Sequence, residues 1–406
     1  MLDSAPMNHP THPIYLDHNS TTPPNDQVVA RLKEWSGLWA NPSSAHSLAR
    51  GPKSALTSVR RQIAGWLNVA PIEIVFTSGG SEGNSAIIKG VFESLKQKGS
   101  RNRYVFSEVE HPSIVRSADW LKKQGAEVEW IPCNRDGLLD LEFYESVLKK
   151  EDVALVSVMF ANNETGSIFP IKKMAAKAHK HGALFHTDAV QIAGKVRFDF
   201  GNLNVDYATF AGHKFYALKG AGWTYIKKNV PYSSLIIGGG QERSRRAGTE
   251  NLLAIASIGE MITQLETNLD KHISHMSSLR DEMEELVEKL LPEVKITGAG
   301  APRLSNTSNF VIDGMDGDTL LMRLDLRGYC VSTGSACSSG AQEPSRVLRA
   351  MGLSHREANA SVRVSIGWGT TREQIHNFCH ELQDAVQSIR ESQTHATGSR
   401  SDLVQL

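Results

Sequence analysis

The sequence predicts an α/β protein with a mainly parallel seven-stranded sheet flanked by helices, and with a smaller α+β domain. Two observations support this prediction. Between residues 71 and 226, short apolar runs rich in β-branched residues alternate with segments of helical periodicity, the pattern of βαβ units. The chain also has 406 residues, more than the roughly 250–300 that a single hydrophobic core accommodates, so at least two packed units are expected.

Seven apolar runs are expected to form the strands of the sheet. They are Ile72–Thr77, Arg103–Ser107, Glu127–Pro132, Val153–Met159, Ala183–Thr187, Asp206–Phe210 and Gly222–Ile226. Open sheets of this kind bind ligands at the carboxyl ends of their strands. Functional residues are therefore expected directly after these runs.

A long helix is expected after the last strand. Apolar residues recur at a spacing near 3.6 from Leu265 to Leu290, and Pro292 interrupts the pattern. We place a domain boundary near residue 263, so that residues 21–262 form the large domain. Residues 1–20 together with 263–393 are expected to form the small domain, and the polar residues 394–406 a flexible tail.

Composition and charge exclude several classes of function. The 44 basic residues are balanced by 44 acidic ones, so no overall field favours nucleic acid or an anionic membrane. No stretch approaches the ~20 uninterrupted apolar residues of a membrane helix, and residues 1–13 lack the features of a signal peptide. We expect a cytoplasmic protein whose partners bind a local site, with no direct contact to nucleic acid or membrane.

The cysteines indicate one candidate nucleophile. The four cysteines contain no C-x-x-C pair, so we expect a reducing compartment and no metal site. Cys133, Cys330 and Cys379 lie in apolar or helical surroundings and are interpreted as packing residues. Cys337 lies among small and glycyl residues between positions 331 and 340, which is typical of an exposed loop with a reactive thiol. A turn that happens to contain a cysteine is the alternative.

Two segments at strand ends suggest a bound phosphate ester. Lys214 directly follows a strand, where its amine can reach a ligand, although a solvated surface lysine is the alternative. The turn Thr77–Asn84 leads from a strand through glycines into a helix, whose free N–H groups suit a phosphate. Glycines also serve ordinary βα turns. The turn matches neither a Walker loop nor a dinucleotide fingerprint, so a lone phosphate monoester fits it better.

Three further strand ends carry polar groups. Asp188, with Gln191 three residues later, offers a carboxylate to a protonated ring nitrogen, or else a helix N-cap. Asn162–Gly166 offers amide donors for a phenolic oxygen, or else turn chemistry. The Glu110-His111 pair offers an imidazole that can lie on a ring. With Lys214 and the glycine turn, this set matches pyridoxal 5′-phosphate (PLP), which requires a Schiff-base lysine and a carboxylate beside its ring nitrogen.

These motifs occur in one order over nearly the whole chain, and on them the sequence resembles the cysteine desulfurases, class V members of the fold-type I PLP enzymes. The segments that carry the resemblance are Tyr15–Pro23, Asn41–His46, Thr77–Asn84, Glu110-His111, Asn162–Gly166, His186–Gln191, His213-Lys214, Arg246–Asn251 and Ser332–Gly340. The long cysteine loop and Glu343–Arg349 resemble the iron–sulfur-cluster and nitrogen-fixation branch of this family.

The resemblance implies a role for each candidate residue. Lys214 would form the Schiff base, Cys337 would become a persulfide, and His111 would stack on the ring and move protons. Asp188 would pair with the ring nitrogen, and Gln191 and Asn163 would bind the phenolic oxygen or the substrate. Gly80, Ser81 and His213 would hold the phosphate, and Thr249 would bind the phosphate of the other subunit of a homodimer. Arg363 would bind the substrate carboxylate. A guanidinium suits the last task because two parallel N–H···O bonds fix a carboxylate.

The activity that the resemblance implies is conversion of L-cysteine to L-alanine, with sulfur passed to Cys337 and then to an acceptor protein for iron–sulfur cluster assembly or a related pathway. Two alternatives stay open: another class V reaction, such as that of an aminotransferase or a selenocysteine lyase, and a non-catalytic scaffold for sulfur transfer.

Some positions depart from the family. Ala211 replaces a phosphate-binding serine, Ser81 a threonine, and Ala217-Leu218 a Gly-Pro pair. We expect weaker cofactor retention with the chemistry kept.

Overall fold

The computed structural model describes residues 13–96, 101–333 and 344–401, with side chains as far as residue 393. Its main sheet has seven strands in the order β2-β8-β7-β6-β5-β3-β4. The strands are β2 (Ile74–Thr77), β3 (Arg103–Ser107), β4 (Glu127–Ile131), β5 (Val153–Ser157), β6 (Leu184–Asp188), β7 (Tyr207–Ala211) and β8 (Gly222–Ile226). Only β8 runs against its neighbours. The predicted α/β class and all seven expected strands are confirmed, with ends that differ by at most two residues.

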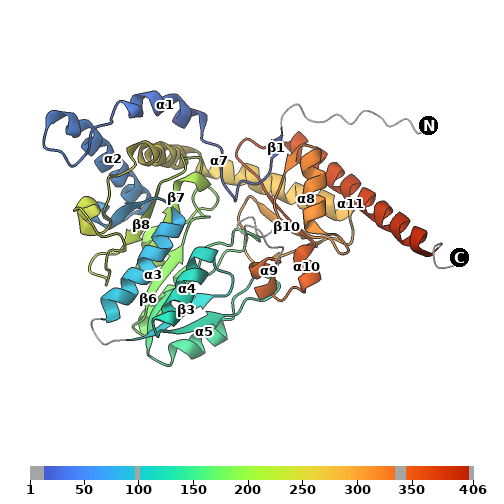
Figure 1. The fold of residues 1–406 in the computed structure, drawn as a ribbon, viewed down its shortest axis with the longest axis horizontal. Helices are drawn as coiled ribbons and strands as arrows, with labels where there is room; N and C mark the ends of the chain where they lie inside the picture. Colours follow the sequence, from blue (N-terminus) through green and yellow to red (C-terminus); the bar gives the residue numbers. More distant parts are fainter. Residues whose placement is uncertain (1–12, 97–100, 334–343, 402–406) are drawn as a thin grey trace.

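Helices cover both faces of this sheet (Figure 1). They are α1 (Asp26–Ser36), α2 (Arg50–Leu67), α3 (Gly80–Lys96), α4 (Pro112–Lys123), α5 (Leu141–Leu148) and α6 (Ile171–Lys180). Side chains alternate between the faces: Tyr104 and Phe106 pack with α3 and α4, whereas Val105 packs with α2, α5 and α6. This period of two is expected for strands that are buried on both sides.

Helix α7 (Leu252–Leu290) connects two hydrophobic cores (Figure 1). Leu265 lies in the core beside the large sheet, and Met276 lies in the second core. The helix begins thirteen residues before the expected apolar stripe, because the side chains from Leu252 to Ile262 are buried on most sides and show no clear periodicity. It ends before Pro292, as expected. The domain boundary that we place near residue 263 falls inside this helix and stays a prediction.

The second core contains a three-stranded antiparallel sheet in the order β12-β10-β9. The described elements that follow α7 are β9 (Lys295–Ile296), β10 (Thr307–Val311), α8 (Gly317–Leu326), β11 (Tyr329–Cys330), α9 (Arg346–Ala350), α10 (His355–Asn359), β12 (Ser361–Ser365) and α11 (Arg372–Ser401). The buried side chains of α9 and α10 pack in the core beside the large sheet, and not in the second core. The N-terminal strand β1 (Ile14–Tyr15) pairs with β11, and Leu16 is fully buried there. Helix α11 continues to Ser401, beyond the point where the flexible tail is expected to begin.

No helix in the described ranges carries an apolar stretch of the length that spans a lipid bilayer.

Candidate active site

A pocket of about 370 Å³ lies at the start of α3. It is lined by Thr21, Ser78, Gly79, Gly80, Ser81, Glu82, His213, Lys219 and Gly220. A Cβ atom added to Gly80 would lie 2.9 Å from Val190 Cγ2, so a side chain is excluded there and a ligand can approach the backbone. The free N–H groups of the helix start and the Lys219 ammonium favour an anion.

One acidic side chain also lines this pocket, and its charge is compensated. Glu82 accepts two hydrogen bonds from Arg246, at 2.9 and 3.2 Å, and one from the Ser78 N–H at 2.9 Å. These interactions lower the pKa of Glu82, although its burial acts in the opposite direction. The pocket can therefore hold a phosphate monoester without an unpaired carboxylate beside it.

Asp188 ends β6 and is 5% exposed. Its Oδ2 accepts a hydrogen bond of 2.6 Å from Asn84 Nδ2 on α3, and its Oδ1 accepts one of 3.0 Å from the Val190 N–H. No described helix begins at Ala189, so the helix-cap alternative for Asp188 is not realised. The carboxylate instead braces the turn after β6 and connects it to α3.

His111 is the N-cap of α4. Its Nδ1 accepts a hydrogen bond of 3.1 Å from the Ser113 N–H and lies 2.8 Å from Ser113 Oγ. The contacts described for the ring thus involve Nδ1, and Nε2 is the nitrogen that can serve a ligand. Burial lowers the pKa of His111; the Asp188 charge opposes this change and the Lys214 charge adds to it. His111, Asp188 and Lys214 therefore share one electrostatic environment.

Lys214 lies in a 3₁₀ turn, Gly212–Lys214, directly after β7. Its Nζ donates hydrogen bonds to the carbonyl oxygens of Asn19, at 2.6 Å, and Ser20, at 2.5 Å. The amine is thus directed into the molecule, toward the segment that follows β1. This geometry is not that of a solvated surface lysine. Beside it, burial lowers the pKa of His213 to about 4, with Lys214 as the second cause.

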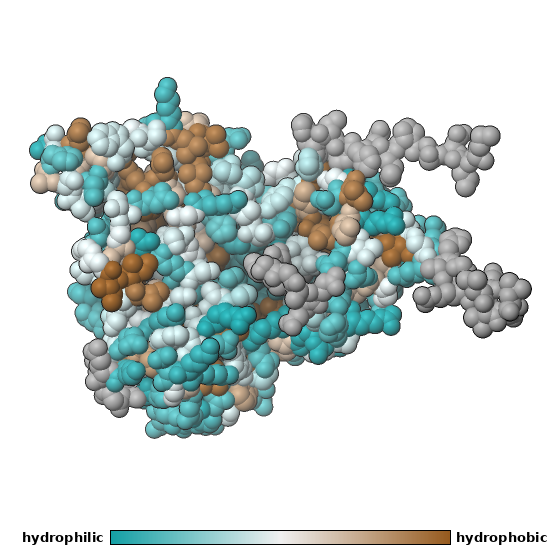
Figure 2. All heavy atoms as spheres, viewed as in Figure 1, coloured by the Kyte–Doolittle hydropathy of each residue, from teal (hydrophilic) through white to brown (hydrophobic). Residues whose placement is uncertain are grey.

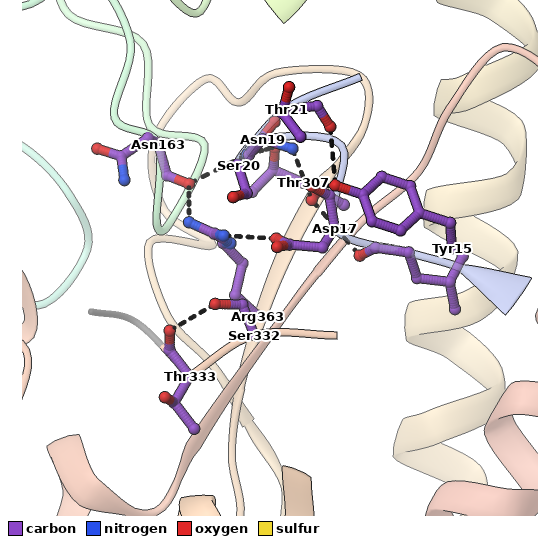
Figure 3. Close-up of polar contacts among 12 residues, drawn as sticks. Tyr15, Asp17, Asn19, Ser20, Thr21, Asn163, Thr307, Ser332, Thr333 and Arg363 are labelled. Carbon is purple, nitrogen blue, oxygen red and sulfur yellow. Dashed lines mark hydrogen bonds and ion pairs between the residues drawn. The ribbon is translucent and has the colours of Figure 1, made fainter. Parts of the chain in front are cut away.

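Arg363 is 2% exposed on β12 and reaches the same segment. Its Nη2 lies 2.6 Å from Asp17 Oδ1, and its Nη1 donates to the Asn163 carbonyl at 3.1 Å (Figure 3). The Asn163 amide points away from the guanidinium in this view. Asn163, expected to supply an amide donor, therefore meets Arg363 through its backbone.

Comparisons with known proteins identify the family. Residues 14–378 match the family model described as aminotransferase class-V. The chain is 38% identical to the cysteine desulfurase IscS of Dictyoglomus turgidum, over 93% of this chain and 95% of that protein.

The chain belongs to the class V aminotransferase family.

Two solved structures of similar proteins support the assignment to this family. A NifS-like protein superposes with a TM-score of 0.86 at 32% identity, covering 92% of this chain and 99% of its own. A structure described as SspA in complex with cysteine superposes with a TM-score of 0.75 at 31% identity, covering 88% of this chain and 99% of its own.

Of the expected site residues of this class V aminotransferase, one is not described and one lies apart from the pocket at α3. Cys337 lies outside the described residues. Thr249 is exposed and is not among the described residues that line the pocket at α3. Its expected partner is the phosphate of a second subunit, so its position in a single chain leaves that prediction open. The departures Ala211 and Ala217 are both buried, at 2% and 1% exposure.

The loop that contains Asn163 owes its shape to a neighbouring residue. Asn162 Oδ1 accepts hydrogen bonds from the Glu164 and Thr165 N–H groups at 2.8 and 3.0 Å, and its Nδ2 donates to the Val109 carbonyl at 3.0 Å. The turn-chemistry alternative is therefore correct for Asn162.

The sequence analysis missed several residues of the site. Gln191, which was expected, lies 3.0 Å from the Asn19 carbonyl through Nε2 and 2.5 Å from Lys195 Nζ through Oε1. Neither Asn19 nor Lys195 was assigned a role, and neither were Asp17 and Asn84. Asp17 and Asn19 lie within the Tyr15–Pro23 motif, which was the available signal. The only feature of the sequence that could have indicated a role for Lys195 was its position, four residues after Gln191.

Proposed function

We propose that this chain is a PLP-dependent cysteine desulfurase. One observation carries the proposal: a lysine, a carboxylate, an imidazole and a pocket at a helix start meet at one edge of the sheet, in a chain whose relatives bear that name. When bound, PLP supplies an electron sink that stabilises negative charge at the α-carbon of an amino acid.

The residues present fit PLP at both of its polar ends. Gly80, Ser81 and His213 would hold the phosphate at the start of α3, with Lys219 as an additional cation. Asp188, held in place by Asn84, would pair with the ring nitrogen. His111 would lie on the ring, and Gln191 would donate to the phenolic oxygen.

The chain supplies the groups that move protons and sulfur. Lys214 would hold the cofactor covalently as a Schiff base; once the amino group of the substrate has displaced it, the freed Nζ would take the proton from the substrate α-carbon. The Cys337 thiolate would attack the sulfur of L-cysteine; a sulfur–sulfur bond forms, and the electron pair of the broken carbon–sulfur bond stays with the carbon. Protonation of that carbon, together with return of the α-proton by Lys214, gives alanine. His111 Nε2 would accept the proton of the substrate thiol.

Arg363 would bind the substrate carboxylate. Its burial on β12 removes competing water, and the contacts with Asp17 and the Asn163 carbonyl hold the guanidinium plane. A fixed guanidinium presents its N–H groups to a carboxylate in one orientation, which aligns the α-carbon of the amino acid.

We further propose a homodimer and a sulfur-acceptor protein as partners. Leu235, Ile236 and Ile237 are exposed by 37%, 37% and 90%, close in sequence to the exposed Thr249. Figure 2 shows apolar side chains on the side of the molecule where the chain between β8 and α7 reaches the surface. A second subunit would cover them and receive Thr249 at its phosphate site. The acceptor would serve iron–sulfur cluster assembly or another sulfur-transfer pathway.

Mass spectrometry tests the proposal. After PLP-loaded protein is exposed to L-cysteine without reductant, the peptide that contains Cys337 should gain the mass of one sulfur atom, and alanine should form in equal amount. Cys330, which is partly buried, serves as the internal control. Cys337→Ala should keep the cofactor absorbance but release no sulfide under reductant. An unmodified Cys337 with normal alanine formation would favour another class V reaction, and a chain that binds no PLP would favour the scaffold.

A further inference from the structure

Lys195 is a buried lysine beside the proposed cofactor site that has no role in the reaction described above. It lies in the turn after β6 and is 4% exposed. Its Nζ donates to two amide oxygens, Gln191 Oε1 at 2.5 Å and Asn19 Oδ1 at 2.9 Å. Burying an amine costs free energy unless its N–H groups are well satisfied. The amine here is satisfied by two residues that themselves contact the site.

The contact with Lys195 fixes which way the Gln191 amide faces. A lysine Nζ donates hydrogen bonds to this oxygen, so the amide nitrogen must point to the opposite side, where it donates to the Asn19 carbonyl at 3.0 Å. One N–H of Gln191 Nε2 is used in this way, and the second can be offered to a ligand. Burial, Lys214 and Arg363 lower the pKa of Lys195 well below its ordinary value, and even the neutral amine keeps two N–H groups for its two partners.

The contact with Asn19 extends the effect of Lys195 to the proposed Schiff-base lysine. The Asn19 carbonyl accepts from both Gln191 and Lys214, whose Nζ lies 2.6 Å away. The Asn19 side chain is held between Lys195 and β10, where its Nδ2 donates to Thr307 Oγ1 at 2.8 Å. Lys195 therefore braces the segment whose carbonyl oxygen receives the Lys214 amine.

We propose that Lys195 is a positioning residue that orients the Gln191 amide toward the cofactor and, through Asn19, holds the Lys214 amine in place. This inference rests on the proposed function, because Gln191 and Lys214 are assigned to the cofactor there. Lys195 acts through these residues and makes no contact of its own with cofactor or substrate.

Lys195→Met removes the N–H donors while keeping a long apolar side chain. Lys227→Met is the matched control, since Lys227 is half-exposed and donates to Asn204 Oδ1, away from the site. Titration of the apo-protein with PLP, followed by tryptophan fluorescence, should show a dissociation constant about tenfold higher for Lys195→Met, as expected for one lost hydrogen bond. The absorption maximum of the bound cofactor should also shift, and kcat for L-cysteine should fall more than KM rises.

A double-mutant cycle with Gln191→Ala separates positioning from general destabilisation. If Lys195 acts through Gln191, adding Lys195→Met to Gln191→Ala should weaken PLP binding by much less than it does in the wild-type background. Additive effects, or a Lys195→Met variant with the wild-type absorption maximum and affinity, would overturn the inference. Should Lys195→Met not fold, as judged by circular dichroism, Lys195→Gln allows the same cycle. A wild-type chain that binds no PLP would instead refute the proposed function.

Discussion

The guanidinium of Arg363, which is buried, and the carboxylate of Asp17, which is partly exposed, form an ion pair with Nη2 2.6 Å from Oδ1. The two residues are 346 positions apart in the sequence, and their contact joins the segment after β1 to β12. Arg363 Nε is buried and has no partner among the described residues. The guanidinium thus keeps an unused N–H donor, and the Asp17 carboxylate orients it. This arrangement suits a residue that binds the carboxylate of a substrate.

Replacing Arg363 with lysine should weaken substrate binding. A lysine keeps the charge but cannot form two parallel hydrogen bonds, so KM for L-cysteine should rise by about 10–100-fold, the equivalent of one charge-assisted hydrogen bond, with a smaller change in kcat. Steady-state kinetics with PLP-loaded protein measure this change. Arg135→Lys, at a surface ion pair with Glu357, is the control and should leave KM unchanged. An unaltered KM for Arg363→Lys would remove Arg363 from the substrate site.

Lys214 should be the residue that holds the cofactor covalently. Borohydride reduction of PLP-loaded protein should attach the cofactor to Lys214, as located by peptide mass spectrometry. Lys214→Ala should lose the absorption band of the bound cofactor and all desulfurase activity, because the variant lacks the amine that would hold the cofactor. Lys227→Ala should retain both. A label on another lysine would refute the assignment of Lys214.

Restoring a hydroxyl at position 211 should improve cofactor retention. Ala211 is the last residue of β7, and its Cβ lies 3.9 Å from the position that a Cβ on Gly80 would occupy, so its side chain faces the start of α3. A serine hydroxyl there can donate to the phosphate, and Ala211→Ser should lower the PLP dissociation constant by about 10–100-fold. Equilibrium titration of the two apo-proteins decides this. Equal affinities would mean that the missing hydroxyl has no effect.

Glu110 should make stability fall as pH rises. Burial raises the pKa of Glu110 to about 8, against the hydrogen bonds from Ser107 Oγ and the Met159 N–H. The folded state therefore keeps a proton that the unfolded state, with a pKa near 4.5, releases. This contribution is complete below about pH 4.5 and is lost as pH rises through about 8.

Below pH 6.5 the buried His18 and the partly buried His213, whose pKa values are lowered to about 4, act in the opposite direction, so the effect of Glu110 is measured above it. Burial also raises the pKa of Glu164 to about 7 and lowers that of Lys195, so the contribution of Glu110 is isolated by comparison with Glu110→Gln. Between pH 6.5 and 8 the free energy of unfolding should fall by about 1–2 kcal/mol through Glu110. The comparison is the urea midpoint of apo-protein at both pH values for wild type and Glu110→Gln. The variant should show a flatter dependence; parallel slopes would mean that Glu110 is ionised throughout.

Local patterns in the sequence were sufficient for the strands and for the residues that follow them. Each strand of the large sheet is a short run that is buried except at the edge strand β4, and the run alone defines which residue stands at its carboxyl end. Asp188 and Lys214 could therefore be placed at one edge of the sheet before their contacts were known. The start of α7 could not be predicted from a local pattern, because a helix that is buried on most sides has no periodic apolar stripe.

The sequence by itself determined the α/β class, the seven strands and the positions of the lysine and the carboxylate, because each depends on a pattern within a few neighbouring residues. Only the tertiary structure decided that Asp17 pairs with Arg363 and that Lys195 and Gln191 meet at Asn19. These contacts join residues between 170 and 350 positions apart. Their partners are chosen by how two cores pack against one N-terminal segment, and no periodicity along a single chain encodes that packing.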